Sequence, residues 1–283
     1  METETAMKMT ILNTMRFSTK FLRVIIFILI IVTHTFIMTS FAAHPLITDD
    51  TGTQGKGKYL FELNGQVGYD REKSINDAGA NIITKGRESE LKTAFTYGII
   101  DNIDVILGIP YQWKKIEESD VTKSDVNGIA DLSLEVKWRF FEKDGLSFAL
   151  KPGLTLPTGD KDNDLGTGRT TAALYFVTTK EVNPWAFHLN LGYKRNENQI
   201  EQRKDIWHAS LAGEYKIMQN LKFVANIGAE KTADKSSEIN PAFLVGGFIY
   251  SIRDNLDIDF GVKIGLNETE KDVAFLGGIA LRF

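Results

Sequence analysis

The 283-residue chain contains no cysteine, which excludes disulfides, thiolate metal sites and cysteine nucleophiles. After residue 43 it has no apolar run that approaches the roughly 20 residues of a membrane-spanning helix. Its mean hydropathy of -0.15 is too polar for a helical membrane protein. The formal net charge is only -4 and the two signs are interspersed, which argues against a nucleic-acid partner.

Residues 58–283 repeat about twelve segments in which apolar and polar side chains alternate. In the first segment Tyr59 and Phe61 share one face, and Glu62 lies on the other. Strict alternation makes a strand with two different faces. Short breaks such as Asp101-Asn102 take turns with long charged ones, as the two rims of an outer-membrane barrel require. The pattern predicts an all-β fold, a transmembrane antiparallel up-and-down β-barrel of about 12 strands, with a soluble sandwich as the alternative.

Aromatic residues favour the membrane barrel, because they gather at strand ends. Two girdles, one at each membrane interface, would place them there, whereas a sandwich core would hold tryptophan near strand centres. On this interpretation Trp113 and Trp207 lie on the long-loop rim, and Trp138 and Trp185 on the short-turn rim. The predicted girdle residues are Tyr59, Tyr69, Trp113, Trp138, Trp185 and Trp207.

Residues 1–42 are predicted to be a secretory signal peptide. Basic residues up to Arg23 precede an apolar run over residues 24–32, and small residues allow cleavage after Ala42. Thr33-His34-Thr35 ends the run before it reaches the length of a membrane anchor, which is the alternative. Residues 43–57 are then expected to form an N-terminal periplasmic segment, and residues 58–283 the barrel.

Two features predict local irregularity. Pro110 and Pro152 fall inside predicted strands, where the missing N–H removes a ladder bond, so we expect bulges or kinks there. The long polar breaks, including residues 70–87 and 115–127, are predicted to be loops.

Inward positions of the predicted strands carry charges of both signs. The lumen-lining candidates are Glu62, Glu90, Lys92, Glu135, Lys137, Arg139, Lys151, His188 and His208. A mixed-charge interior fits either a hydrated pore or a salt-bridged plug, and both remain open. In the second half of the barrel Val224, Ile249 and Leu276 make the inward face less polar. This less polar inward face, named here the apolar lane, would suit an amphipathic or aromatic solute. Alternatively, its side chains could pack together and close a narrow barrel.

No catalytic constellation is found, so we expect no enzyme activity, no cofactor and no metal site. His188 and His208 both face the lumen at different heights, whereas an outer-membrane lipid hydrolase needs Ser and His on the outer wall near the outer leaflet. Acidic pairs such as Glu117-Glu118 are interpreted as solvated charge or loose divalent-ion binding to lipopolysaccharide. Asp49-Asp50 is interpreted as a structural turn, with Ca²⁺ binding as the alternative.

Two stretches carry a resemblance to a known family: His44 to Gly57, and Gly-Leu-Thr-Leu-Pro-Thr-Gly-Asp at residues 153–160. They resemble bacterial outer-membrane proteins named for a role in the meta-cleavage pathway of phenol degradation and often labelled transporters. The resemblance implies uptake of aromatic compounds. The end of the chain also resembles the terminal strand signal that barrel-assembly machinery reads, with Ile279, Leu281 and Phe283 alternating outward.

These observations predict an outer-membrane channel of a Gram-negative bacterium that passively admits small hydrophobic or aromatic solutes. The alternatives are a structural or adhesive surface barrel without transport activity and, less favoured, an outer-membrane lipid hydrolase. The expected partners are outer-membrane lipid and lipopolysaccharide, the barrel-assembly machinery and a small-molecule solute, with no nucleic acid.

Overall fold

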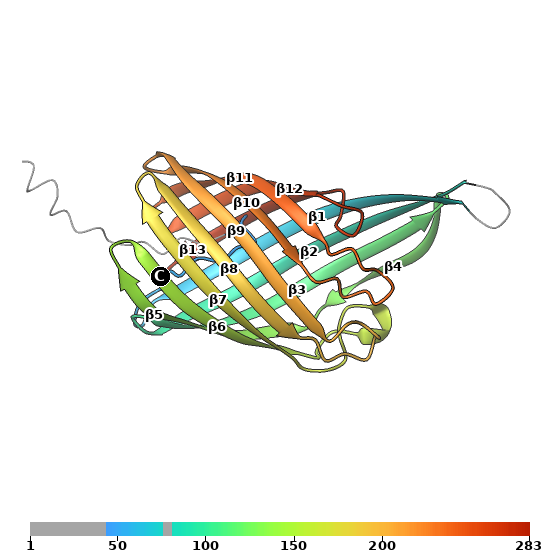
Figure 1. Ribbon diagram of the computed structural model, residues 1–283, viewed down its shortest axis with the longest axis horizontal. Helices are drawn as coiled ribbons and strands as arrows, with labels where there is room; N and C mark the ends of the chain where they lie inside the picture. Colours follow the sequence, from blue (N-terminus) through green and yellow to red (C-terminus); the bar gives the residue numbers. More distant parts are fainter. Residues whose placement is uncertain (1–43, 76–80) are drawn as a thin grey trace, which may run out of the picture. The chain divides into compact units, whose positions relative to one another are not determined.

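The computed structural model describes residues 44–75 and 81–283, which form a closed antiparallel β-barrel (Figure 1). The predicted signal peptide lies outside the described residues. Within the described residues, no helix is long and apolar enough to cross a membrane. The elements are β1 (Tyr59–Ile75), β2 (Asn81–Ile100), β3 (Ile103–Glu118), β4 (Val121–Ile129), β5 (Leu132–Lys143), β6 (Leu146–Leu156), the 3-10 helix η1 (Lys161–Asn163), β7 (Thr171–Val182), β8 (Trp185–Arg195), β9 (Asp205–Met218), β10 (Leu221–Glu230), β11 (Ala242–Arg253), β12 (Leu256–Gly265) and β13 (Val273–Arg282).

The barrel is a meander in which strands pair with their neighbours along the chain, and β1 closes the ring by pairing with β13. Strand β3 has two partners on one side: residues 103–108 pair with β5, and residues 111–118 pair with β4. Strands β4 and β5 therefore share one position in the ring, interrupted at Ala130-Asp131. The prediction of a closed antiparallel barrel with twelve strand positions is confirmed.

The bulges predicted at the two prolines are not found, because the pairing register does not shift at either one. Pro110 lies where β3 exchanges β5 for β4. Pro152 pairs with Leu174 on β7, while the ladder to β5 omits the rungs opposite it. The missing N–H of each proline therefore interrupts the hydrogen-bonded ladder on one side of the strand, and no extra residue is inserted as in a β-bulge.

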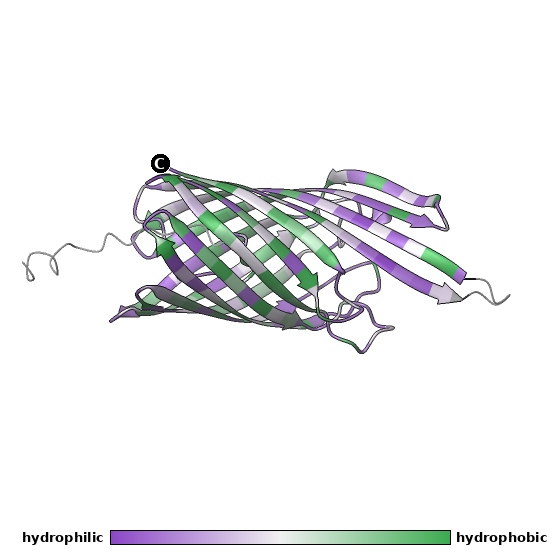
Figure 2. Cartoon of the chain, turned by 90° about the horizontal axis from the view of Figure 1, so that it is seen from above, coloured by the Kyte–Doolittle hydropathy of each residue, from purple (hydrophilic) through white to green (hydrophobic). Residues whose placement is uncertain are grey.

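The two faces of the wall differ in exposure even on β11, where side chains on both faces are apolar. On β11, Phe243, Val245 and Ile249 face inward and are at most 5% exposed. Their neighbours Leu244 and Phe248 face outward and are 39% and 47% exposed. Bands of hydrophobic colour cover the outer wall of the barrel body (Figure 2). An apolar outer band is what lipid tails require of a spanning barrel.

All four tryptophans lie on the outer surface, with 42–47% of each residue exposed. Trp185 begins β8 beside a short turn, and Trp138 pairs with the first residue of β3 beside another. Trp113 and Trp207 stand toward the opposite, long-loop rim. None is buried in a core, as the sandwich alternative would have required.

Two of the predicted long loops are strands. Strands β1 and β2 stay paired from Tyr59/Tyr97 to Ile75/Asn81, and β3 and β4 stay paired up to Glu118/Val121. Together they project beyond the rim as a four-stranded sheet, named here the projecting sheet (Figure 1). The loop prediction for residues 70–87 and 115–127 is wrong, because a strand outside lipid needs no apolar face and loses the expected pattern.

Candidate functional site

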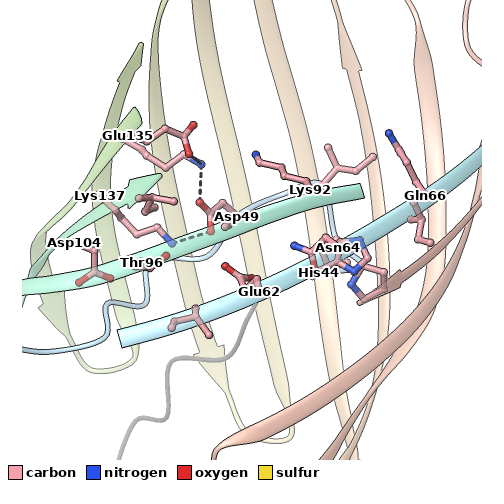
Figure 3. Close-up of a pocket in the computed structure, with 18 of the residues that line it drawn as sticks. His44, Asp49, Glu62, Asn64, Gln66, Lys92, Thr96, Asp104, Glu135 and Lys137 are labelled. Atoms are coloured by element: carbon pink, nitrogen blue, oxygen red, sulfur yellow. Dashed lines mark hydrogen bonds and ion pairs between the residues drawn. The ribbon is translucent and has the colours of Figure 1, made fainter. Parts of the chain in front are cut away.

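The N-terminal segment, residues 44–57, lies against the inner wall of the barrel (Figure 3). Its residues Thr48, Thr51 and Thr53 are buried. Hydrogen bonds to the wall hold this stretch, predicted from the sequence to be an N-terminal periplasmic segment, inside the lumen. The sequence alone gave no periodic signal for this docking, since the segment forms no strand or helix.

The segment meets the wall closely at the short-turn rim. The N–H of Gly57 donates to the carbonyl of Gly98 (2.8 Å) on β2. A Cβ on Gly98 would lie 1.9 Å from the carbonyl oxygen of Gly55, so no larger residue fits there without moving the backbone. The N–H of Lys56 donates to the carboxylate of Asp101 (3.0 Å), which fixes the segment to the β2–β3 turn.

Further inside the lumen, Asn226 of β10 holds the segment through its side-chain amide. Its oxygen accepts from the N–H groups of Ile47 (2.8 Å) and Thr48 (3.1 Å). Its nitrogen donates to the hydroxyl of Thr48 (2.7 Å), which donates to Ser210 of β9 (2.7 Å). Asn226 is buried, so these bonds satisfy polar groups that would otherwise be costly to bury.

A second set of anchors reaches the opposite wall. The N–H of Thr51 donates to the hydroxyl of Thr179 on β7 (3.1 Å), and the hydroxyl of Thr51 lies 2.5 Å from that of Ser147 on β6. The N–H of Gln54 donates to the carboxylate of Asp104 on β3 (2.9 Å). The segment is therefore fixed to strands on both sides of the lumen.

Asp49 forms ion pairs with two lysines of the barrel wall. Its carboxylate accepts hydrogen bonds from Lys137 of β5 (2.8 Å) and Lys151 of β6 (2.9 Å) (Figure 3). Lys151 also lies 3.6 Å from Glu135, and Lys137 lies 3.9 Å from Asp50. Burial by itself raises the pKa of Asp49, but the charges and hydrogen bonds of the two lysines outweigh it and hold the pKa below its ordinary value. Of the two alternatives left open by the sequence, this part of the lumen is a salt-bridged plug.

The apolar lane of the lumen receives Leu46. This side chain packs in a buried cluster with Ala212, Val224 and Ile249. Next to it Pro45 touches β11 and β12, where a Cβ on Gly261 would lie 2.8 Å from the proline ring. The lane is therefore closed by packing at this level, as one of the two sequence-based alternatives has it.

A cavity of about 290 Å³ remains between the N-terminal segment and the wall formed by β1, β2, β3, β5, β6 and β13. Most of its lining side chains are polar or charged, and Leu46, Leu60 and Leu276 lie among them. Six of the predicted lumen residues line it: Glu62, Glu90, Lys92, Glu135, Lys137 and Lys151. Figure 3 shows Glu62 and Lys92 pointing toward the segment from neighbouring strands.

The remaining lumen candidates, Arg139, His188 and His208, do not line this cavity. Arg139 pairs with Glu142 (3.2 Å) near the short-turn rim. His188 is buried, with Nδ1 2.9 Å from Thr179 and Nε2 3.6 Å from Glu214.

His208 belongs to a separate polar group. Its Nε2 lies 2.9 Å from the hydroxyl of Ser210, and its Nδ1 lies 3.4 Å from Glu230. A serine, a histidine and a carboxylate in this order resemble an acyl-transfer triad. However, Ser210 is only 4% exposed and its hydroxyl already accepts the hydrogen bond from Thr48. Ser210 thus contributes to holding the N-terminal segment through Thr48.

The predicted girdle and assembly residues lie on the outer wall. Tyr59 and Tyr69 are exposed, as are Ile279 and Phe283, while Leu281 pairs with Phe61 at the barrel closure. Across the described residues, no group of three His, Cys, Asp or Glu side chains is placed to hold a metal ion.

A closed antiparallel barrel with an apolar outer wall and a polar, partly filled lumen defines an outer-membrane β-barrel. The chain belongs to the family described as "Putative MetA-pathway of phenol degradation", whose model matches residues 48–283. The sequence-based resemblance to this family is thereby confirmed. A search of curated protein sequences finds no match.

Solved structures share the fold at low sequence identity. An outer-membrane channel from Pseudomonas putida F1 is 14% identical with a TM-score of 0.64, over 83% of this chain and 98% of that one. The translocator domain of the autotransporter NalP from Neisseria meningitidis is 11% identical with a TM-score of 0.51, over 82% and 91%. At these identities the comparison establishes the barrel fold.

Proposed function

We propose that this barrel passively admits small hydrophobic or aromatic solutes through the outer membrane. The observation that carries the proposal is the cavity of about 290 Å³ inside the closed barrel, beside the N-terminal segment. Leu46, Leu60 and Leu276 contribute apolar contacts for an aromatic ring, and the charged side chains that also line the cavity can orient a hydroxyl or carboxylate.

One comparison supports the solute class and another supports a channel. The family is named for phenol degradation, and the Pseudomonas putida relative is described as an outer-membrane channel. Passive movement suffices, because the sequence carries no nucleotide-binding loop.

We propose further that the outer aromatic residues anchor the barrel at the two interfaces and that the terminal residues are read during assembly. Outer-membrane lipid, lipopolysaccharide and the assembly machinery are the corresponding partners. Hydrolase activity is not part of the proposal, because the buried hydroxyl of Ser210 is engaged by Thr48.

The transport proposal is tested by filling the cavity. Ala94 lines it and is buried, so Ala94→Trp places an indole into the space. Ala172 is exposed on the outer face of β7, so Ala172→Trp makes the same change toward lipid. The measurement is the initial uptake rate of radiolabelled phenol by Gram-negative cells that express each protein.

Wild type and Ala172→Trp should raise uptake above cells without the barrel, and Ala94→Trp should lose most of that increase. Heat-modifiable migration on gels checks that each barrel is folded. No increase with wild type, or an equal loss in both variants, would contradict the proposal.

A further inference from the structure

The outward face of the projecting sheet carries a cluster of cations, named here the outer basic patch: Arg71, Lys85, Arg87 and Lys115. Arg71 lies directly opposite Lys85 across the β1–β2 ladder, and Arg87 lies directly opposite Lys115 across the β2–β3 ladder. Lys73 follows Arg71 two residues later and so shares its face. Two like-charged cross-strand pairs thus stand side by side on three adjacent strands.

Like charges directly opposite each other destabilise a sheet, so a bound anion would stabilise this arrangement. Carboxylates of the chain neutralise part of this positive charge, because Lys85 pairs with Asp120 (2.6 Å) and Lys115 pairs with Glu117 (2.7 Å). The hydrogen bond from Lys85, then its charge and that of Arg71, hold the pKa of Asp120 below its ordinary value. The surroundings of the turn are therefore positive.

The two arginines are not neutralised in this way. Within residues 44–75 and 81–283, no carboxylate forms an ion pair with Arg71 or Arg87. Both side chains are exposed. The guanidinium of Arg87 lies over the ring of Tyr69, 5.9 Å from its centroid, which fixes its position without consuming its charge.

The position of the patch matches the headgroup level of the outer leaflet. Tyr69 is the outward aromatic residue at the end of the β1–β13 pairing, and the outward Trp113 of β3 lies opposite Ser89, two residues from Arg87 on β2. Aromatic residues at strand ends mark the membrane interface, and the long-loop side of such barrels faces outward from the cell. The patch begins with Arg87, which lies directly opposite Tyr69 in the β1–β2 ladder, and it faces away from the barrel axis.

The opposite face of the same strands is mainly acidic. Glu72, Glu88 and Glu118 occupy inward positions there, and Lys271 pairs with Glu88. The outward face is not purely basic, because Glu117 lies opposite Lys85 and Asp125 lies opposite Lys115. The two arginines, which form no ion pair with a carboxylate among the described residues, leave this face with positive charge that attracts an anion.

We propose that the outer basic patch binds the phosphate groups of the lipopolysaccharide headgroup. Planar guanidinium groups form two parallel hydrogen bonds to phosphate, and two arginines on adjacent strands can hold one phosphorylated sugar between them. The acyl chains of the same molecule would then lie along the apolar wall below Tyr69. This site is independent of whether the barrel conducts solutes.

The test is binding of a defined short lipopolysaccharide, Kdo2-lipid A, to the full-length barrel in nonionic detergent, followed by native mass spectrometry. The double variant Arg71→Gln/Arg87→Gln should bind at least about ten-fold more weakly than wild type, because it loses the phosphate-directed guanidinium groups. The matched control is Lys143→Gln/Arg253→Gln, which removes two exposed charges at the short-turn rim and should bind like wild type.

Competing ligands distinguish the source of the phosphate. Dephosphorylated lipid A and millimolar inorganic phosphate should neither bind comparably nor displace Kdo2-lipid A, since the site reads phosphate on a membrane-anchored sugar. Equal affinity for phosphatidylglycerol, displacement by inorganic phosphate, or equal weakening in the control variant would each overturn the proposal. Heat-modifiable migration confirms that all variants are folded barrels.

Discussion

Asp49 is a single carboxylate that two lysines of the barrel wall share. Its partners Lys137 and Lys151 are distant in the sequence, on different strands. For that reason the sequence could place the lysines in the lumen but could not foresee what neutralises them. The predicted turn at Asp49-Asp50 is present in part, because Asp50 accepts from the N–H of Gly52 (2.6 Å). Ion pairs between distant residues depend on the fold and leave no local pattern.

Replacing Asp49 by asparagine should loosen the N-terminal segment without unfolding the barrel. Removing one partner of a buried ion pair typically costs about 3–5 kcal/mol, because the remaining charges are left uncompensated. Here that cost falls on docking of the segment, so ion conductance in planar bilayers should rise while the melting temperature of the barrel changes little. Asp50→Asn is the control, since Asp50 lies 3.9 Å from Lys137 and accepts mainly from its own turn. Equal conductance of Asp49→Asn and wild type would show that these ion pairs do not hold the segment.

The strands were predictable because lipid on one side and a lumen on the other impose an alternation that can be read directly. Strand β8 shows this, with Leu189 outward between the inward polar residues His188 and Asn190. The projecting sheet was not predictable, because beyond the membrane Arg71 and Glu72 alternate in charge but not in polarity. The N-terminal segment escaped prediction for a different reason, since irregular backbone has no period.

The closing strand pair depends on the last residue. Phe283 forms two backbone hydrogen bonds with Tyr59. The N–H of Tyr59 donates to the carbonyl of Phe283 (3.1 Å), and the N–H of Phe283 donates to the carbonyl of Tyr59 (2.9 Å). The ring of Phe283 is exposed on the outer wall. Phe283→Asp keeps these backbone bonds but places a charge at the interface, so the yield of folded barrel in the outer membrane should fall several-fold. Phe283→Tyr keeps an interfacial ring and should assemble normally. The measurement is heat-modifiable migration of outer-membrane fractions, and undiminished folding of Phe283→Asp would refute the assembly role.

At the scale of the whole molecule, the barrel is a membrane wall whose lumen is divided by its own N-terminal segment. One side is closed by packing around Leu46, and the other retains the cavity beside Glu62 and Lys92. A solute therefore has a space to enter while the segment stays docked. This division of the lumen is the central claim of the account.

The most direct test is to lock the segment in place and measure uptake. The chain has no cysteine, and the hydroxyls of Thr51 and Ser147 are 2.5 Å apart, so Thr51→Cys/Ser147→Cys provides a single pair of thiols near disulfide distance. The account predicts that cells carrying this variant take up radiolabelled phenol at the same initial rate when the disulfide is oxidised and when it is reduced. Uptake that is lost on oxidation and restored by reductant would mean that the N-terminal segment must leave the lumen before phenol can pass. That result would contradict a solute path beside the docked segment.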